Sequence, residues 1–151
     1  MALSARNKKI NGVHPAETRS CRVVRAGETY RGKQGLNYFA GISAESVGAE
    51  AICMHLLVMP AGATGKAHYH AEHETAIYMI EGVTEFAHGE WLEHVARVEP
   101  GDFVYIPAGV WHLPYNPTAQ VAKALIARTD PREQEGVVVL GGPPDKGGDR
   151  R

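Results

Sequence analysis

Short segments with strand character alternate with tight-turn residues along most of the chain, and this spacing restricts the possible folds more than any other feature. Glycine, proline and acidic residues mark the turns, as in Glu81-Gly82 and Pro100-Gly101-Asp102. The segments between such turns predict strands at residues 21–25, 36–43, 51–59, 66–70, 75–80, 83–88, 91–98, 103–106, 111–115 and 121–128. Because no long helical pattern separates them, the sequence predicts an antiparallel β-sandwich or β-barrel.

The composition fits one domain and argues against several classes of function. A chain of 151 residues can hold a single core. Its 16 basic and 17 acidic residues nearly balance, which argues against a nucleic acid or an anionic membrane as a partner. The longest apolar runs, such as residues 76–80, are too short to span a bilayer, and the N-terminal residues lack the apolar stretch of a signal peptide. We therefore expect a cytoplasmic protein.

Three regions are expected along the chain. Residues 1–19 are polar and lack periodicity, which predicts an N-terminal arm. Residues 20–130 carry the strand pattern and predict the barrel domain. Residues 131–151 form a C-terminal extension, and its glycine, proline and charged residues predict disorder from about residue 141.

A cluster of histidines carries the strongest chemical signal. Side chains alternate between the two faces of a strand, so His68 and His70 must point the same way. Glu74 follows shortly after them, and His112 can add a fourth ligand from a separate strand. Imidazole and carboxylate groups together suit a divalent transition metal. The sequence therefore predicts a metal centre formed by His68, His70, Glu74 and His112.

The same residues lie in two motifs that resemble those of the cupin superfamily. The first set is Gly62, His68, His70, Glu74 and Gly82, and the second is Gly101, Pro107, Gly109, His112 and Asn116. The resemblance covers about residues 62–116. It implies a small single-domain cupin of the bacterial type, all-β, with a double-stranded β-helix or jelly-roll barrel.

One departure from the family pattern concerns the fourth ligand. Gly82 lies one residue further from Glu74 than in the family, so counting back from Gly82 places Thr75 in the ligand position. A carboxylate is the better ligand for a divalent ion, and a β-bulge between Glu74 and Tyr78 can absorb the extra residue. His73 is the alternative ligand, which would make a four-histidine site.

The resemblance implies one divalent metal per chain, which could be Fe, Mn, Ni, Zn, Co or Cu. The leading interpretation is a metal-dependent enzyme that acts on a small molecule, with dioxygenase chemistry first and an isomerase or lyase as an alternative. The competing interpretation is a non-catalytic cupin that binds or senses a small molecule, and the orientation of His55 and Tyr105 would help to separate the two. We identify no catalytic residue from the sequence. The resemblance also implies a homodimer.

Overall fold

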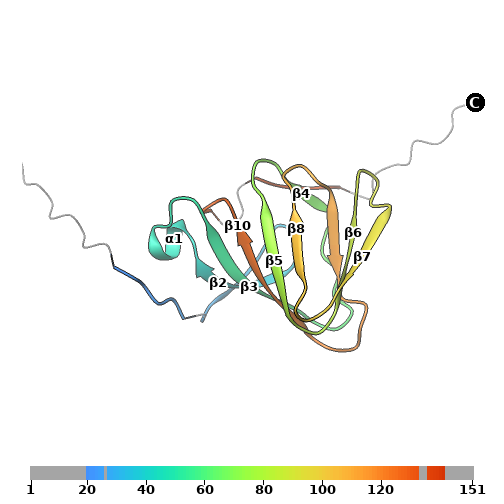
Figure 1. Ribbon diagram of the computed structural model, residues 1–151, viewed down its shortest axis with the longest axis horizontal. Coiled ribbons are helices and arrows are strands. Elements are labelled where there is room, and N and C mark those ends of the chain that lie inside the picture. Colours follow the sequence, from blue (N-terminus) through green and yellow to red (C-terminus); the bar gives the residue numbers. More distant parts are fainter. Residues whose placement is uncertain (1–19, 26, 133–135, 142–151) are drawn as a thin grey trace, which may run out of the picture.

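The structure is a computed structural model that describes residues 20–25, 27–132 and 136–141 (Figure 1). Almost all of its regular structure is β. The elements are β1 Thr29–Arg31, β2 Asn37–Ile42, α1 Ala44–Val47, β3 Cys53–Met59, β4 His68–His70, β5 Thr75–Glu81, β6 Thr84–His88, β7 His94–Val98, β8 Phe103–Ile106, β9 His112–Tyr115, β10 Ala122–Arg128 and β11 Val137–Val139.

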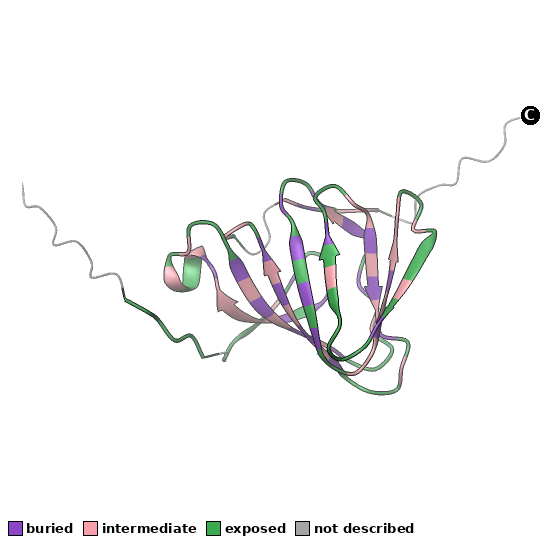
Figure 2. Ribbon diagram, viewed as in Figure 1, coloured by how far each residue is buried: buried purple, intermediate pink, exposed green. Residues whose placement is uncertain are grey.

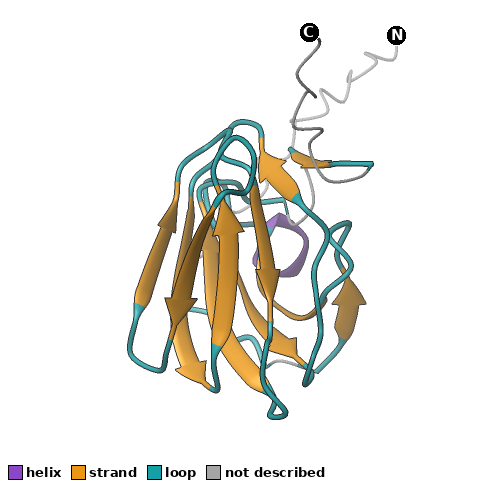
Figure 3. Cartoon of the chain, turned by 90° about the vertical axis from the view of Figure 1, so that its right-hand side faces the viewer, coloured by secondary structure: helices purple, strands orange, loops and turns teal. Residues whose placement is uncertain are grey.

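The strands form two antiparallel sheets that build a jelly-roll barrel (Figure 3). The six-stranded sheet has the order β1-β2-β3-β10-β5-β8, and the five-stranded sheet has the order β11-β4-β9-β6-β7. Strands β3, β10 and β5 are adjacent although they are far apart in sequence, as a jelly roll requires. The all-β jelly-roll barrel expected from the sequence is therefore confirmed.

Alternation of side chains along the strands places the core between the two sheets. In β5, Ile77 and Met79 are buried whereas Tyr78 and Ile80 are exposed (Figure 2). β3 and β10 show the same period of two over their whole length. The inward residues form one cluster, made of Leu36, Tyr38, Leu57, Met59, Ile77, Met79, Phe86, Val98, Ile106, Ala122, Ala124 and Ile126.

Asn116 of the second motif ties two loops together. Its Nδ2 donates hydrogen bonds to the carbonyls of Met59, Pro60 and Gln120 at 3.2, 3.1 and 2.7 Å. Its Oδ1 accepts from the Thr118 backbone N–H at 3.0 Å. All polar atoms of this buried amide therefore have partners, which indicates a structural role for the residue.

The N-terminal part of the barrel differs from the strand prediction. Residues 20–25 are exposed and form no strand, and the first strand is β1, which pairs with β2. The strand predicted at 36–43 ends at Ile42 because Ser43 caps α1: its side chain accepts from the Ser46 N–H at 3.2 Å, and Ser46 Oγ accepts from the Ser43 N–H at 2.9 Å. Among the described residues, no helix has the length and apolar character needed to cross a membrane.

The barrel also extends beyond residue 130, where the sequence analysis places its end. β11 pairs with β4 and adds an edge strand to the five-stranded sheet, with Val137 opposite His70 and Val139 opposite His68. Three consecutive valines are good strand formers, but only the free edge of β4 gives so short a segment a partner. The expected N-terminal arm at 1–19 and the expected disorder after residue 141 lie outside the described residues.

Candidate metal centre

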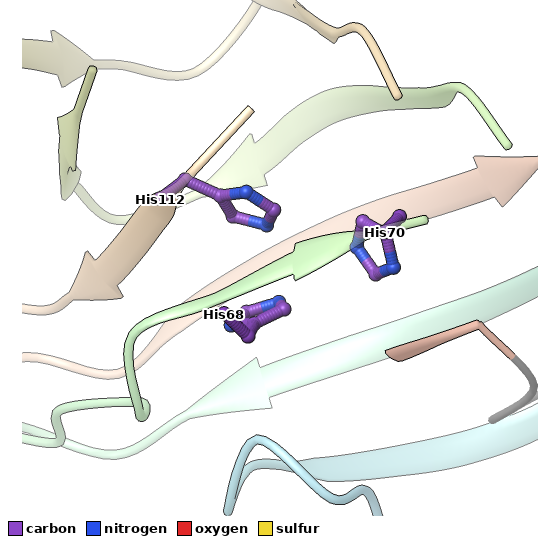
Figure 4. Close-up of side chains that lie close together, drawn as sticks. All are labelled: His68, His70 and His112. Atoms are coloured by element: carbon purple, nitrogen blue, oxygen red, sulfur yellow. The ribbon is translucent and has the colours of Figure 1, made fainter. Parts of the chain in front are cut away.

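Three of the four expected ligands converge inside the barrel. His68 and His70 are the first and last residues of β4 and both are buried, while Tyr69 between them is partly exposed. His112 begins β9 directly opposite His68. One ring nitrogen from each histidine lies within 4.8 Å of the others, and the three rings gather in one place (Figure 4).

Backbone carbonyls fix the orientation of two of these rings. His68 donates from Nδ1 to the Lys66 carbonyl at 2.7 Å, and His112 donates from Nδ1 to the Val110 carbonyl at 2.9 Å. A ring that donates through Nδ1 keeps the Nε2 lone pair available, which is the usual arrangement of a metal-binding histidine. Nδ1 of His70 is buried without a hydrogen-bond partner. This unsatisfied nitrogen fits a site that receives a cation.

The surroundings keep all three imidazoles neutral at physiological pH. Burial, together with the nearby His112, lowers the pKa of His68 from 6.5 to about 3. Burial lowers the pKa of His112 to about 4. The pKa of His70 falls further still, mainly because of burial and the charge of Arg128. Because metals bind the deprotonated ring, this environment prepares all three side chains as ligands.

The opposite wall of the cavity comes from the six-stranded sheet. Thr75 of β5 and Arg128 of β10 are cross-strand partners, and both side chains are buried. Together with the histidines they line a small inner cavity of about 20 Å³. The lining residues are Leu36, Tyr38, Leu57, His68, His70, Thr75, Ile77, Phe86, Ile106, His112, Pro114, Ile126 and Arg128.

Glu74, the fourth expected ligand, does not join the cluster. Its side chain is exposed on the outer face and accepts a hydrogen bond from the Tyr105 hydroxyl at 2.6 Å. Thr75 points inward instead, as counting back from Gly82 suggests. The expected bulge between Glu74 and Tyr78 is absent, because β5 pairs with β10 in continuous register from Thr75 to Met79. The irregularity lies beyond Met79, opposite Lys123 and Ala124.

His73, the alternative ligand, is buried next to His70. Its ring packs against that of His70 at 4.5 Å between centroids, and its Nδ1 lies 3.5 Å from Asp130 Oδ2. It is not one of the three histidines whose ring nitrogens converge. His73 therefore contacts the ring of His70 but adds no nitrogen to the converging set.

His55 and Tyr105, whose orientation was expected to distinguish an enzyme from a binding protein, do not line the inner cavity. His55 is buried on β3, where its Nδ1 accepts a hydrogen bond from the Gly41 N–H at 3.2 Å. Tyr105 is 62% exposed and points toward Glu74 on the outer face.

Sequence reasoning overlooked Arg128, although a signal for it exists. β10 buries Ala122, Ala124 and Ile126, so the same alternation places Arg128 on the inward face. It is 3% exposed.

A larger cleft adjoins the inner cavity. Its volume is about 660 Å³, and it opens along β7 and β8, the edge strands of the two sheets. It is lined by residues 86, 88, 96–98, 102–107, 110 and 112. The cleft and the inner cavity share Phe86, Ile106 and His112. One of the three histidines is therefore within reach of a small molecule held in the cleft.

Histidines that converge inside a jelly-roll barrel are typical of metal-binding cupins, and the comparisons with known proteins point to the same family. The sequence profile described as "Cupin domain" matches residues 55–128, which include the three histidines and Arg128. This chain belongs to the cupin superfamily. No curated protein matches its sequence.

Solved structures resemble the chain at the level of the fold. The polyketide cyclase RemF from Streptomyces resistomycificus has a TM-score of 0.65 and 20% identity over 83% of this chain and 89% of its own. A Cupin 2 conserved barrel domain protein from Salinispora arenicola has a TM-score of 0.59 and 20% identity over 76% and 91%. An oxalate decarboxylase variant from B. subtilis has a TM-score of 0.66 and 19% identity over 83% and 35%.

Proposed function

We propose that this protein binds one divalent transition metal through His68, His70 and His112 and uses it to act on a small molecule. The observation that carries the proposal is the convergence of three buried, neutral imidazoles on one point, with a ring nitrogen of His70 left unsatisfied. The donor set fits such an ion, because imidazole binds Fe, Mn, Ni, Zn, Co and Cu. When bound, the ion would supply a Lewis acid with coordination positions for substrate oxygen atoms or for dioxygen.

The residues that line the inner cavity favour a dioxygenase over an isomerase or lyase. An isomerase or lyase needs a protein group that can take up or release a proton near neutral pH. Apart from the proposed ligands, the titratable groups that line the inner cavity are Tyr38 and Arg128. Burial raises the pKa of Tyr38, so its hydroxyl stays protonated, and an arginine stays charged. Dioxygenase chemistry at the metal needs no such group.

The test is metal binding by wild-type protein and by matched variants. We expect one divalent ion per wild-type chain, measured by mass spectrometry of protein loaded with a single metal. His112→Ala should weaken metal binding at least about 100-fold, because it removes the only ligand from β9. Glu74→Gln and His94→Ala should keep wild-type affinity, because both side chains are exposed and lie outside the cluster. Circular dichroism checks that each variant folds.

Two outcomes would contradict the proposal. Full metal occupancy in His112→Ala would show that β9 contributes no metal ligand. A loss in Glu74→Gln as large as that in His112→Ala would place the carboxylate in the ligand set. Screening the metal-loaded protein for oxygen consumption with small oxygen-rich acids and phenols then tests the reaction class.

We also propose that the protein is a homodimer. On the outer face of the six-stranded sheet, apolar residues lie opposite one another on adjacent strands. Such a face normally carries polar side chains, because it meets water. The row runs through five adjacent strands as Phe39, Leu56, Leu125, Tyr78 and Phe103. Phe103 is 81% exposed and Tyr78 is 39% exposed. A second copy of the same face would cover this row, since an isologous interface needs a self-complementary patch.

A further inference from the structure

Arg128 is the one buried cation of the inner cavity, and its charge is not neutralised there. Its side chain is 3% exposed, and its Nε and Nη1 are buried without hydrogen-bond partners. No Asp or Glu is among the residues that line the cavity. Buried charges are normally paired, because burying an unpaired ion carries a large desolvation cost. The vacant donors of Arg128 therefore indicate a missing acceptor.

The contacts that Arg128 does make cannot replace this acceptor. Its guanidinium lies 5.7 Å from the centre of the Tyr38 ring, which gives a cation–π contact on one face. The Tyr38 hydroxyl also interacts with Arg128 and accepts a hydrogen bond from Gln34. A neutral phenol leaves the positive charge in place. The same charge contributes to lowering the pKa of His68, His70 and His112, so its field reaches all three proposed ligands.

The charge balance of the metal-loaded site also favours an anionic ligand. Three neutral histidines and one threonine bring no negative charge to a divalent ion, and Arg128 adds a further positive charge. The two cations would repel each other in a medium of low dielectric. An anionic ligand between them would offset this repulsion and satisfy the free donors of Arg128 at the same time.

We propose that Arg128 is the residue that selects an anionic substrate, and that it binds a carboxylate group of a small organic acid inside the inner cavity. The inference rests on the proposed function, since it places this carboxylate next to the metal site. A cavity of about 20 Å³ admits little more than such a head group. The body of the acid would lie in the adjoining cleft, where Phe86 and Ile106 provide apolar surface shared by both spaces.

The experiment titrates cobalt-loaded protein with formate, the smallest carboxylate, and with formamide, its neutral counterpart. Binding is followed by the visible absorption spectrum of cobalt. We expect formate to bind wild type at least tenfold more tightly than formamide. Arg128→Met should weaken formate binding at least tenfold and leave cobalt binding equal or tighter, because the variant removes a like charge. Arg128→Lys should retain part of the formate affinity, since it keeps the charge without the planar donors.

Arg97→Met is the matched control. Arg97 lines the outer cleft, but it is 53% exposed and already paired with Glu85 and Glu99 at 3.6 and 3.0 Å. Its loss should leave formate affinity unchanged. Equal formate affinity in wild type and Arg128→Met would overturn the inference. So would a weaker cobalt affinity in Arg128→Met with undiminished preference for formate over formamide, since that pattern marks a purely structural arginine.

A failure of the proposed metal binding can be distinguished from a failure of the proposed anion site. If wild type binds no cobalt, the metal proposal is wrong, and formate is then tested on the metal-free protein by thermal denaturation. A formate-dependent rise in Tm in wild type that is lost in Arg128→Met would still support the anion site. No rise in wild type would overturn it. If Arg128→Met does not fold, Arg128→Gln takes its place in both titrations.

Discussion

The residues that matter most for this protein are polar groups placed where apolar ones would otherwise pack. His68, His70 and His112 occupy inward positions of β4 and β9 and are each no more than 3% exposed. Burying three imidazoles and an arginine lowers stability unless each finds a partner. The burial that lowers stability also destabilises the protonated rings, and it therefore leaves their lone pairs available to a metal.

The depressed histidine pKa values predict that the metal-free protein loses stability on mild acidification. The unfolded chain takes up protons near pH 6.5, whereas folded His68 and His112 stay neutral down to about 3 and 4. The free energy of unfolding should therefore fall as the pH drops from 7 toward 4, by about 1.4 kcal/mol per pH unit for each histidine below pH 6. Above pH 7 these groups contribute no pH dependence.

Urea denaturation of chelator-treated protein at several pH values measures this slope. His112→Ala should reduce the slope by the contribution of one proton, and His94→Ala should leave it unchanged, since the His94 side chain is 65% exposed. A free energy of unfolding that stays constant between pH 7 and pH 5 would contradict the prediction.

At the level of single elements, glycines with left-handed backbone form the turns of the two motifs. Gly62, Gly82, Gly101 and Gly109 all have positive φ, as the turn positions of the two motifs suggest. Gly82 lies between β5 and β6, with φ at +74°. Its Cα also packs tightly against β10, because a Cβ there would lie 2.5 Å from the Val121 carbonyl oxygen. The turn therefore lets the β5–β6 connection approach the start of β10 closely.

Gly82→Ala should consequently destabilise the fold by about 2 kcal/mol or more, because left-handed strain and a backbone clash add together. Gly62→Ala is the matched control. Gly62 has a similar φ of +68° but no atom within 4 Å of an added Cβ, so only the strain of about 1 kcal/mol applies. Urea denaturation of both variants measures the difference, and equal losses would show that the contact with β10 does not matter.

At the scale of the whole molecule, the outer face of the six-stranded sheet is more apolar than one exposed to water would normally be. The five aligned apolar residues from Phe39 to Phe103 cross the sheet at nearly its full width. β8 is also an edge strand with its outer side unpaired in the sheet. Edge strands and apolar faces both favour association with another chain.

Light scattering at micromolar concentration should therefore give the mass of a dimer for the wild-type protein. Phe103→Glu should shift the mass to that of a monomer with little change in monomer stability, because the side chain is 81% exposed. Val95→Glu changes a residue that is 61% exposed but lies on β7 of the other sheet, and should leave the dimer intact. A monomeric wild type, or equal effects of both variants, would rule out this face as the interface.

Residues with local signals were predictable from sequence. Alternation identified β3, β5 and β10 within a few residues, and it placed His68 and His70 on one face. The turn glycines of the two motifs were likewise recognisable. The short strand β11 and the exposed segment 20–25 were not, because a segment of a few residues becomes a strand only when a free edge lies beside it.

The sequence by itself determined the β-barrel class and placed His68 and His70 on one face of a strand, because the period of two and the turn chemistry act over neighbouring residues. His112 was expected beside them from the second motif, and the pairing of β9 with β4 brings it there. Only the tertiary structure decided the opposite wall of the site. Whether Glu74 or Thr75 faces inward depends on the register between β5 and β10, and a slip of one residue reverses every side chain. That register brings Thr75 and Arg128 into the cavity and leaves Glu74 outside, because it is set by pairing between strands far apart in the chain.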